Sequence, residues 1–487
     1  MFSLVNKVDS LITLRSAKLF TDQPTQISLT VRDQDDLDQL LKQGIYPTSL
    51  ICELKDVEEV DFSGFVNLKS LTLTGWGEKV ILPTTLETLV DDEAVVIKFS
   101  PSFEKLLKMK TLHIPWSSNE EYFDGKLPPN LTKLHVENEG WKKPFPFPYP
   151  VPQSVTELWF TGYDDAEMYN QLPKTLTSLR PEILYDKINL AQFRHLTDLQ
   201  LNYEDDIEDN NLYRELITLP LKSLILFYDG DDLESEILPY LPKTLTELTL
   251  WFNIDIDVNL DLSQLTQLRT LVIDHIWPSS QTQVVLPASL TNFSISSDVV
   301  TENFSVDFSK VRELLVLRVA NRGKELELRG LTPDMVKNLQ DYHANRAHPL
   351  LRSSWSIQNL RLNEELTGLD KRYPHVVRLE LHSLSSELTF PPNLQELKLE
   401  ELTLTKSDLP QGLVRLKISQ LTLFPDYNFE SKVWRNLVQD QVLMTVLDRE
   451  RKTLTQISQI TALKNQGDVK NEYFLRAIIG ATPMKTY

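Results

Sequence analysis

Residues 82–89 read Leu82-Pro-Thr-Thr-Leu-Glu-Thr-Leu89, and this phrase decides the fold because it returns along most of the chain. Close copies begin at Leu127, Leu172, Leu241 and Leu286, and shorter variants begin at Val151, Phe390 and Leu409. Without the proline, the unit is apolar-x-x-apolar-x-apolar, and we call its three apolar residues the anchors. Sixteen units follow this pattern, the one at 86 with Asp91 as its third position, and their first anchors are at positions 68, 86, 109, 131, 155, 176, 196, 221, 245, 268, 290, 314, 357, 376, 394 and 413.

The spacing of the anchors predicts a solenoid of short coils. The first twelve units recur about every 22 residues and the last four about every 19, which is typical of stacked repeats. The last two anchors have one residue between them, as in a short strand with one buried face. In eight units a proline stands three residues before the first anchor, where it needs no ladder hydrogen bond. Each coil leaves an apolar edge that only its neighbour covers, so we expect a parallel sheet with one strand per coil.

These phrases resemble the leucine-rich repeat superfamily, and the Leu-Pro-x-Ser/Thr-Leu-x-x-Leu form looks most like its FNIP-type and fungal short-coil members. The resemblance covers roughly residues 45–424. It implies an α/β repeat solenoid, a curved array with the parallel sheet on its concave face. The asparagine that usually follows the last strand leucine by three residues is mostly absent, with Asn253 as the clear match. The usual asparagine ladder is therefore not expected here.

Three segments depart from the repeat and define the predicted domains. Residues 1–44 should form an N-terminal cap, with a strand over 27–31 and a helix over 33–42. A 43-residue gap inside the 45–424 solenoid predicts a helical insertion at about 320–356, with a helix from Thr332-Pro333-Asp334 to about Tyr342. Residues 425–487 should form a helical C-terminal cap, because 426–466 lack Gly and Pro and keep helical apolar spacing.

Composition excludes several classes of protein. The 487 residues carry 50 Lys and Arg against 69 Asp and Glu, a formal charge of −19, which argues against binding to nucleic acid or to an anionic membrane. The single cysteine, Cys52, excludes an internal disulfide. No stretch approaches the roughly 18 apolar residues of a membrane span, and the N-terminus does not read as a secretory signal. We therefore expect a cytoplasmic or nuclear protein.

Catalytic and cofactor motifs are absent from the sequence. It contains no GxGxxG, GK[ST], HExxH or GxSxG phrase, and its eight histidines are scattered. We therefore predict that the chain is not an enzyme, has no cofactor and has no metal site. The residue between the last two anchors should instead point away from the core, onto the exposed face of the sheet. Its most distinctive occupants are the candidate partner-binding residues His113, His135, Trp159, Arg180, Arg318, Arg361, Lys398 and Lys417.

The favoured function is a non-enzymatic scaffold for protein–protein interaction, on the pattern of the superfamily that the repeats resemble. Partners should bind either the concave face or an edge of acidic residues that follow the strands, such as Asp91, Asp274 and the run 204–209. One alternative is an adaptor of a ubiquitin ligase or a regulator of a phosphatase or GTPase, although no Leu-Pro opening of an F-box occurs before Tyr46-Pro47. A second alternative is an enzyme whose site the motifs do not reveal.

Overall fold

The computed structural model describes residues 26–31, 33–91, 95–116, 126–138, 150–161, 166–181, 189–202, 211–228, 238–252, 255–256, 259–274, 277–278, 283–297, 304–321, 326–344, 356–362, 373–383, 390–404, 412–413, 415–423, 444–447 and 453–455. The chain divides into two compact units, Met1–Leu245 and Thr246–Tyr487, here called unit 1 and unit 2. Each unit is described by itself.

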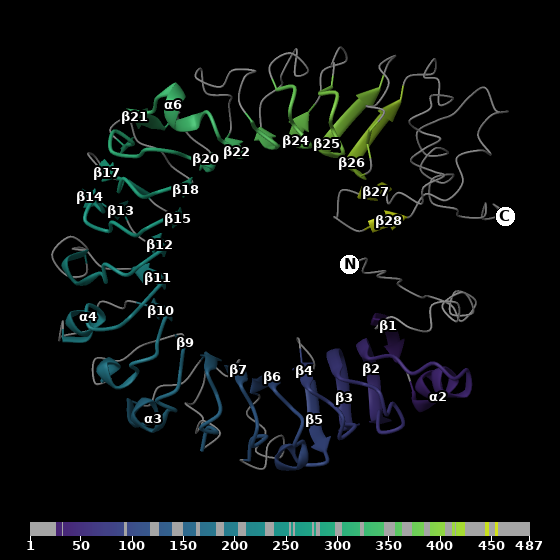
Figure 1. Cartoon of the computed structure of the whole chain (residues 1–487). Coiled ribbons are helices and arrows are strands. Elements are labelled where there is room, and N and C mark those ends of the chain that lie inside the picture. Colours follow the sequence, from purple (N-terminus) through teal and green to yellow (C-terminus); the bar gives the residue numbers. More distant parts are fainter. Residues whose placement is uncertain are drawn as a thin grey trace. The chain divides into compact units, whose positions relative to one another are not determined.

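Unit 1 is a stack of coils whose strands pair side by side in parallel (Figure 1). Its main sheet contains β1 (Gln26–Val31), β2 (Ser49–Asp61), β3 (Ser70–Ile81), β4 (Thr88–Asp91), β6 (Thr111–Trp116), β7 (Lys133–Asn138), β8 (Glu157–Phe160), β9 (Ser178–Pro181), β10 (Asp198–Asn202) and β11 (Ser223–Tyr228). The far half of β3 also pairs with β5 (Val95–Ser100). The other elements are α2 (Gln34–Lys42), α3 (Ala166–Gln171), α4 (Asn211–Leu216) and the short 3-10 turns Phe103–Lys105, Leu190–Gln192 and Leu238–Tyr240.

Unit 2 repeats this arrangement. Its main sheet contains β12 (Glu247–Phe252), β15 (Thr270–Asp274), β18 (Asn292–Ser297), β20 (Val316–Asn321), β22 (Asp341–Ala344), β23 (Asn359–Leu362), β24 (Arg378–Ser383), β25 (Glu396–Leu404), β26 (Arg415–Leu423), β27 (Met444–Leu447) and β28 (Thr453–Thr455). A second parallel sheet joins β14 (Leu260–Asp261), β17 (Gln283–Val285), β19 (Ser305–Asp307) and β21 (Glu327–Arg329). The remaining elements are β13 (Asp255–Ile256), β16 (Trp277–Pro278) and α6 (Pro333–Val336).

The anchors form the core of each unit, as their spacing predicts. In the coil that contains β7, the anchors Leu131, Leu134 and Val136 are buried, while the residues between them face outward. All sixteen predicted units contribute a strand, and neighbouring strands align anchor to anchor, for example Leu134 with Leu112 on β6 and Leu158 on β8. The predicted leucine-rich-repeat solenoid is therefore confirmed within each unit, with one parallel strand of the main sheet per coil, and some coils of unit 2 add a strand to the second sheet.

In the units that contain it, the proline of the repeat closes a turn that leads into the strand. The Pro83 carbonyl accepts a hydrogen bond from the Leu86 N–H at 3.2 Å, and Pro128 and Leu131 repeat this contact at 3.3 Å. The ring fixes φ near the value that the start of such a turn needs, and the missing N–H has no partner to satisfy. The sequence therefore places proline where the coil bends.

Hydroxyl groups link successive coils where an asparagine ladder is missing. The residue just before the first anchor donates to the carbonyl of the preceding coil's first anchor: Thr85 to Leu68 at 2.9 Å, Ser154 to Leu131 at 2.6 Å, Thr244 to Leu221 at 2.6 Å and Ser289 to Leu268 at 2.7 Å. Each bond satisfies a backbone carbonyl that the turn leaves without a ladder partner. Serine and threonine thus supply coil-to-coil hydrogen bonds at this position.

The predicted N-terminal strand and helix are present as β1 and α2. The Asp33 side chain caps the helix by accepting a hydrogen bond from the Asp36 N–H, and Leu37 and Leu40 are buried. Gly44 follows the helix with a φ of 67°, a left-handed conformation that glycine adopts without strain. The division into a cap at 1–44, a solenoid at 45–424 and a cap at 425–487 stays a prediction, and residues 1–25 lie outside the described part.

The segment between the twelfth and thirteenth predicted units differs from the expectation. The predicted helix ends at Val336 rather than near Tyr342, and Tyr342 lies in β22, which pairs in parallel with β20 and β23. Leu339, Tyr342 and Ala344 are buried and act as the anchors of a further coil. The pattern missed this coil because a tyrosine and an alanine replace leucines as the second and third anchors.

The predicted C-terminal helices also differ where the structure describes them. Residues 444–447 and 453–455 form β27 and β28; β27 pairs in parallel with β26, and β28 pairs antiparallel with β27. The outer edge of β26 offers unpaired backbone groups, and an extended segment satisfies them better than a helix. The rest of the predicted helical cap lies outside the described residues. Among the described helices, none is long and apolar enough to cross a membrane.

Candidate functional site

The residues predicted to face outward form one row across the strands of each unit. In unit 1 the strand register places Thr72, Val90, His113, His135, Trp159 and Arg180 beside one another, from β3 to β9. In unit 2 it places Arg318, His343, Arg361, Glu380, Lys398 and Lys417 beside one another, from β20 to β26. All eight predicted site residues therefore occupy this position of the coil.

His113, His135 and Trp159 form a stacked column in unit 1, here called the aromatic row. The ring centroids of His113 and His135 are 3.8 Å apart with planes at 19°, and those of His135 and Trp159 are 3.8 Å apart with planes at 8°. Adjacent strands lie about 4.8 Å apart, so the rings tilt slightly to reach contact. Trp159 remains 40% exposed and covers one face of the column.

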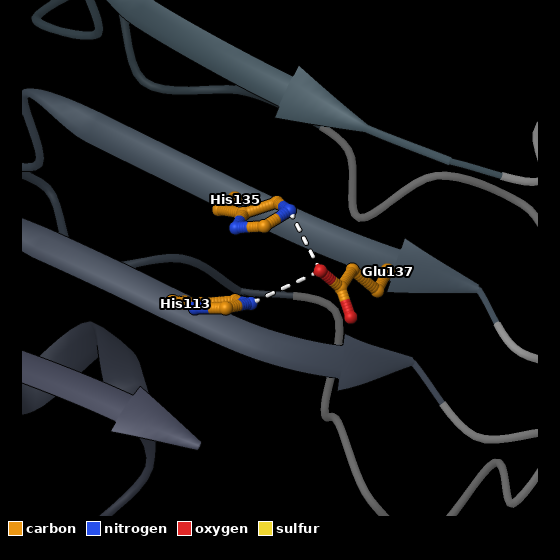
Figure 2. A group of neighbouring side chains, drawn as sticks. All are labelled: His113, His135 and Glu137. Carbon is orange, nitrogen blue, oxygen red and sulfur yellow. Dashed lines mark ion pairs between the residues drawn. The ribbon is translucent and has the colours of Figure 1, made fainter. Parts of the chain in front are cut away.

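Glu137 lies beside the aromatic row and was not among the predicted site residues. It follows His135 by two positions on β7, so both side chains stand on the same face of the sheet. Its Oε1 atom is 3.1 Å from Nε2 of His135 and 3.5 Å from Nε2 of His113 (Figure 2). The sequence signal was the His-x-Glu spacing, which becomes informative only beside a histidine on the neighbouring strand.

Burial, and then the nearby His113 ring, lower the pKa of His135 to about 3. His135 is therefore neutral at neutral pH, so the short distance to Glu137 is not an ion pair under those conditions. A neutral imidazole stacks on its neighbours without the desolvation cost of a cation. The electrostatic state of the aromatic row is thus set by its burial.

Arg180 stands next to Trp159 on β9, at the end of the aromatic row. Its Nε atom donates to Oδ1 of Asp198 on β10 at 3.1 Å, and the Ser178 hydroxyl donates to the same oxygen at 2.8 Å. Arg180 is therefore held by a carboxylate one strand away. The structure places it in the predicted row but gives it a partner that the pattern did not foresee.

The row of unit 2 combines three cations with a histidine and a carboxylate, and we call Arg318, His343, Arg361, Glu380 and Lys398 the charged row. Arg318 donates two hydrogen bonds to Asp341 on β22, at 3.2 and 2.8 Å, and this pairing raises its pKa. Glu380 lies between Arg361, at 3.3 Å, and Lys398, whose ammonium donates to it at 2.5 Å. Lys417 continues the row by its backbone register.

This pairing lowers the positive charge that Arg318, Arg361 and Lys398 bring to the row of unit 2. Arg318 pairs with Asp341, whereas Arg361 and Lys398 share Glu380, so two carboxylates partly compensate these three cations. Carboxylates reach these cations because the residue before the second anchor, such as Asp341, also lies at the surface beside the row. Carboxylates beside and within the row therefore offset part of its excess of cations.

The predicted acidic edge is only partly described. Asp91 is 1% exposed, because it occupies a third-anchor position on β4, between Leu73 on β3 and the third anchor of the next coil. Asp274 ends β15 and is half-buried. Residues 204–209 lie outside the described part of the chain. Asp91 therefore belongs to the interior and not to an acidic edge.

Comparison with known proteins finds similar solved structures at low sequence identity. Among solved structures it is similar to CroV588, described as a novel circular LRR protein, with 15% identity over 84% of this chain and 84% of that chain and a TM-score of 0.32. It is also similar to YopM from Yersinia enterocolitica WA-314, with 18% identity over 85% and 86% of the two chains and a TM-score of 0.30. No family model and no curated protein matches the sequence. The leucine-rich-repeat architecture rests on the coils themselves.

Proposed function

We propose that this chain is a non-enzymatic scaffold that binds a protein partner with the exposed strand face of its leucine-rich repeats. The observation that carries the proposal is the aromatic row, in which Trp159 is 40% exposed on a rigid strand. Tryptophan on a preorganised surface is the residue type most enriched among the strongest contacts of protein interfaces. The row is held from below by the buried anchors Leu134 and Leu158, so binding would not require ordering it.

The charged row supports recognition of a different kind. Its cations are interrupted by His343 and by the carboxylate of Glu380, so a partner must match the order of charges along the row rather than a net sign. Such contacts favour specificity and association rate over affinity. We therefore assign the main binding energy to the aromatic row and treat Arg318, Arg361, Lys398 and Lys417 as secondary contacts.

The two alternative functions, an adaptor or regulator and an enzyme, stay predictions. An adaptor of a ubiquitin ligase, or a regulator of a phosphatase or GTPase, would co-purify with a stoichiometric core subunit. An enzyme would need a pocket with a nucleophile or a general base. One described hollow in unit 2 is lined by Ser289, Arg269, Arg312 and Glu313, but the Ser289 hydroxyl donates to the Leu268 carbonyl and is engaged in the coil. A cytoplasmic or nuclear location is likewise an expectation.

The test compares partners captured by the intact protein with those captured by a Trp159→Ala variant. Ile217→Ala is the matched control, because Ile217 is a 52% exposed apolar residue in the turn after α4, away from the strand row. We expect the partner's affinity to fall by 2 kcal/mol or more, about 30-fold, in Trp159→Ala and to be unchanged in Ile217→Ala. Partners that bind both variants like the intact protein would refute the assignment to the aromatic row.

A further inference from the structure

Three side chains of metal-binding type meet on β6 and β7 of unit 1. His113 and His135 are paired residues on neighbouring strands, and Glu137 follows on the second strand. One ligand atom from each lies within 4.8 Å of the other two. Figure 2 shows the two Nε2 atoms turned toward the same carboxylate oxygen.

The donor spacing is close to what a small divalent ion requires. Zinc lies about 2.0–2.2 Å from nitrogen and carboxylate ligands in tetrahedral geometry, which separates the donor atoms by about 3.3–3.5 Å. The two observed distances from Glu137 Oε1 to the histidine nitrogens are 3.1 and 3.5 Å. Two of the three donor pairs therefore lie near coordination spacing, and the two histidine nitrogens lie within 4.8 Å of each other.

One nitrogen of this group, Nε2 of His135, has no hydrogen-bond partner within the described residues. The atom is also buried from solvent. Its 3.1 Å approach to Glu137 is short but does not have the direction of an N–H···O bond. A buried polar atom without such a bond costs free energy, and a bound cation would satisfy it together with the carboxylate.

We propose that His113, His135 and Glu137 form a binding site for zinc or a similar divalent transition metal ion, with one coordination position open. Two imidazoles and one carboxylate are a known ligand set for zinc, whereas magnesium and calcium prefer oxygen ligands alone. The side chains lie on the exposed strand face and Glu137 is 39% exposed, so water or an incoming ligand can take the fourth position. The proposal does not rest on the scaffold function, although His113 and His135 also belong to the aromatic row.

Binding requires the two rings to leave their stack. The Nε2 lone pair lies in the plane of each imidazole, and the planes are nearly parallel at 3.8 Å, so the lone pairs run side by side. The rings must turn about their Cβ–Cγ bonds until both lone pairs converge on the ion. That turn moves His135 away from the face of Trp159, with which it now stacks at 8°. Metal binding should therefore change the environment of Trp159.

The test is a calorimetric titration of the full chain, freed of metal with a chelating resin, with Zn²⁺ alone at neutral pH. The variants are His113→Ala, His135→Ala and Glu137→Gln, of which the last keeps the size of the side chain. His343→Ala is the matched control, because His343 is a half-buried strand histidine in the same position of the coil and lies beside Arg318 and Arg361. Mg²⁺ is the control ion, and circular dichroism establishes that each variant is folded.

We expect one saturable zinc site that His343→Ala retains and that each of the other three variants weakens at least tenfold, since even indirect partners of metal ligands contribute 10–100-fold. Tryptophan fluorescence should change on zinc addition, and this change should disappear in Trp159→Phe. The proposal is overturned if the intact chain shows no saturable binding at micromolar zinc, or if Glu137→Gln or His113→Ala binds zinc like the intact chain. Equal binding of Mg²⁺ would also overturn it.

Discussion

The aromatic row and the charged row occupy the same position of the coil but use it in opposite ways. In unit 1 the position holds rings that stack on one another at 3.8 Å. In unit 2 it holds cations that pair with carboxylates on the next strand, as Arg318 does with Asp341. The scaffold beneath both rows is the same, because buried anchors set the strand spacing in each unit. The repeat thus fixes where a side chain stands and leaves its chemistry open.

The two half-buried histidines of these rows sharpen the comparison. Burial is the main cause that lowers the pKa of His135, to about 3, and the pKa of His343, to about 4. Beyond burial, His135 faces another imidazole, whereas His343 faces Arg361 and Arg318, with Glu380 and Asp341 acting in the opposite direction. A neutral imidazole therefore occupies the middle of both rows, between aromatic rings in unit 1 and between charged side chains in unit 2.

The largest expected effect tests whether the scaffold beneath the two rows is equivalent. Leu134→Ala under the aromatic row and Leu317→Ala under the charged row each remove a second anchor that is at most 2% exposed. Both should lower the free energy of unfolding by about 2–5 kcal/mol, because each leaves a cavity in a packed coil. Chemical denaturation measures the loss. A loss below about 1 kcal/mol at either position would show that the two coils are not packed alike.

A smaller effect should separate stacking from ion pairing. Trp159→Ala removes the outer ring of the aromatic row and should destabilise unit 1 by about 0.5–1.5 kcal/mol beyond the loss of buried area, which is the usual value of an aromatic pair. The effect should be the same at low and high salt, because it involves no net charge. Denaturation of Trp159→Ala and Trp159→Phe at two salt concentrations checks this. A strong dependence on salt would contradict the stacking interpretation.

Lowering the pH should destabilise the charged row through His343. Its pKa of about 4 in the folded protein lies below the ordinary value of 6.5, so the unfolded chain binds the proton more readily. The stability due to the neutral ring is present above pH 6.5 and is lost as the pH falls toward 4. We expect a loss of about 1 kcal/mol, less than the full linkage value because the ring keeps contact with solvent.

The measurement for His343 is the free energy of unfolding between pH 7 and pH 5, a range that spans its ordinary pKa of 6.5 and ends above its folded value of about 4. His343→Gln is the informative variant, since glutamine is polar and does not titrate. The difference in stability between the intact chain and His343→Gln should shift in favour of the variant as the pH falls. A difference that stays constant over this range would mean that His343 is protonated as easily in the folded chain as in the unfolded one.

The smallest effect concerns the ion pairs of the charged row. Arg318→Ala breaks the two hydrogen bonds to Asp341, yet both groups touch solvent, with side chains that are 50% and 20% exposed. Exposed pairs of this kind contribute about 0.2–1 kcal/mol, and salt screens them. Denaturation of Arg318→Ala at low and at 1 M salt should show a difference from the intact chain that shrinks with salt. An effect above 2 kcal/mol would indicate a structural role instead.

Much of the fold follows from the sequence alone, because the anchors repeat at a period that only stacked coils satisfy. The leucines predicted to be buried, such as Leu131 and Leu134, are buried, and the residues between them stand in one row. The prolines and the Ser or Thr before the first anchor also lie where their chemistry predicts. These outcomes depend on local geometry, and local geometry can be read from spacing.

The tertiary structure decided which side chains of neighbouring strands meet, because the spacing of residues along the sequence does not specify these contacts. Glu137 joins His113 only because the register places two strands side by side, and Asp341 neutralises Arg318 for the same reason. The anchor pattern did not predict the coil of β22, because Tyr342 and Ala344 are buried there in place of leucines. The strand β27 forms where helical spacing suggested otherwise, since the edge of β26 offers backbone partners. A sequence specifies which face each residue takes, whereas contacts between strands depend on neighbours that are about twenty residues away.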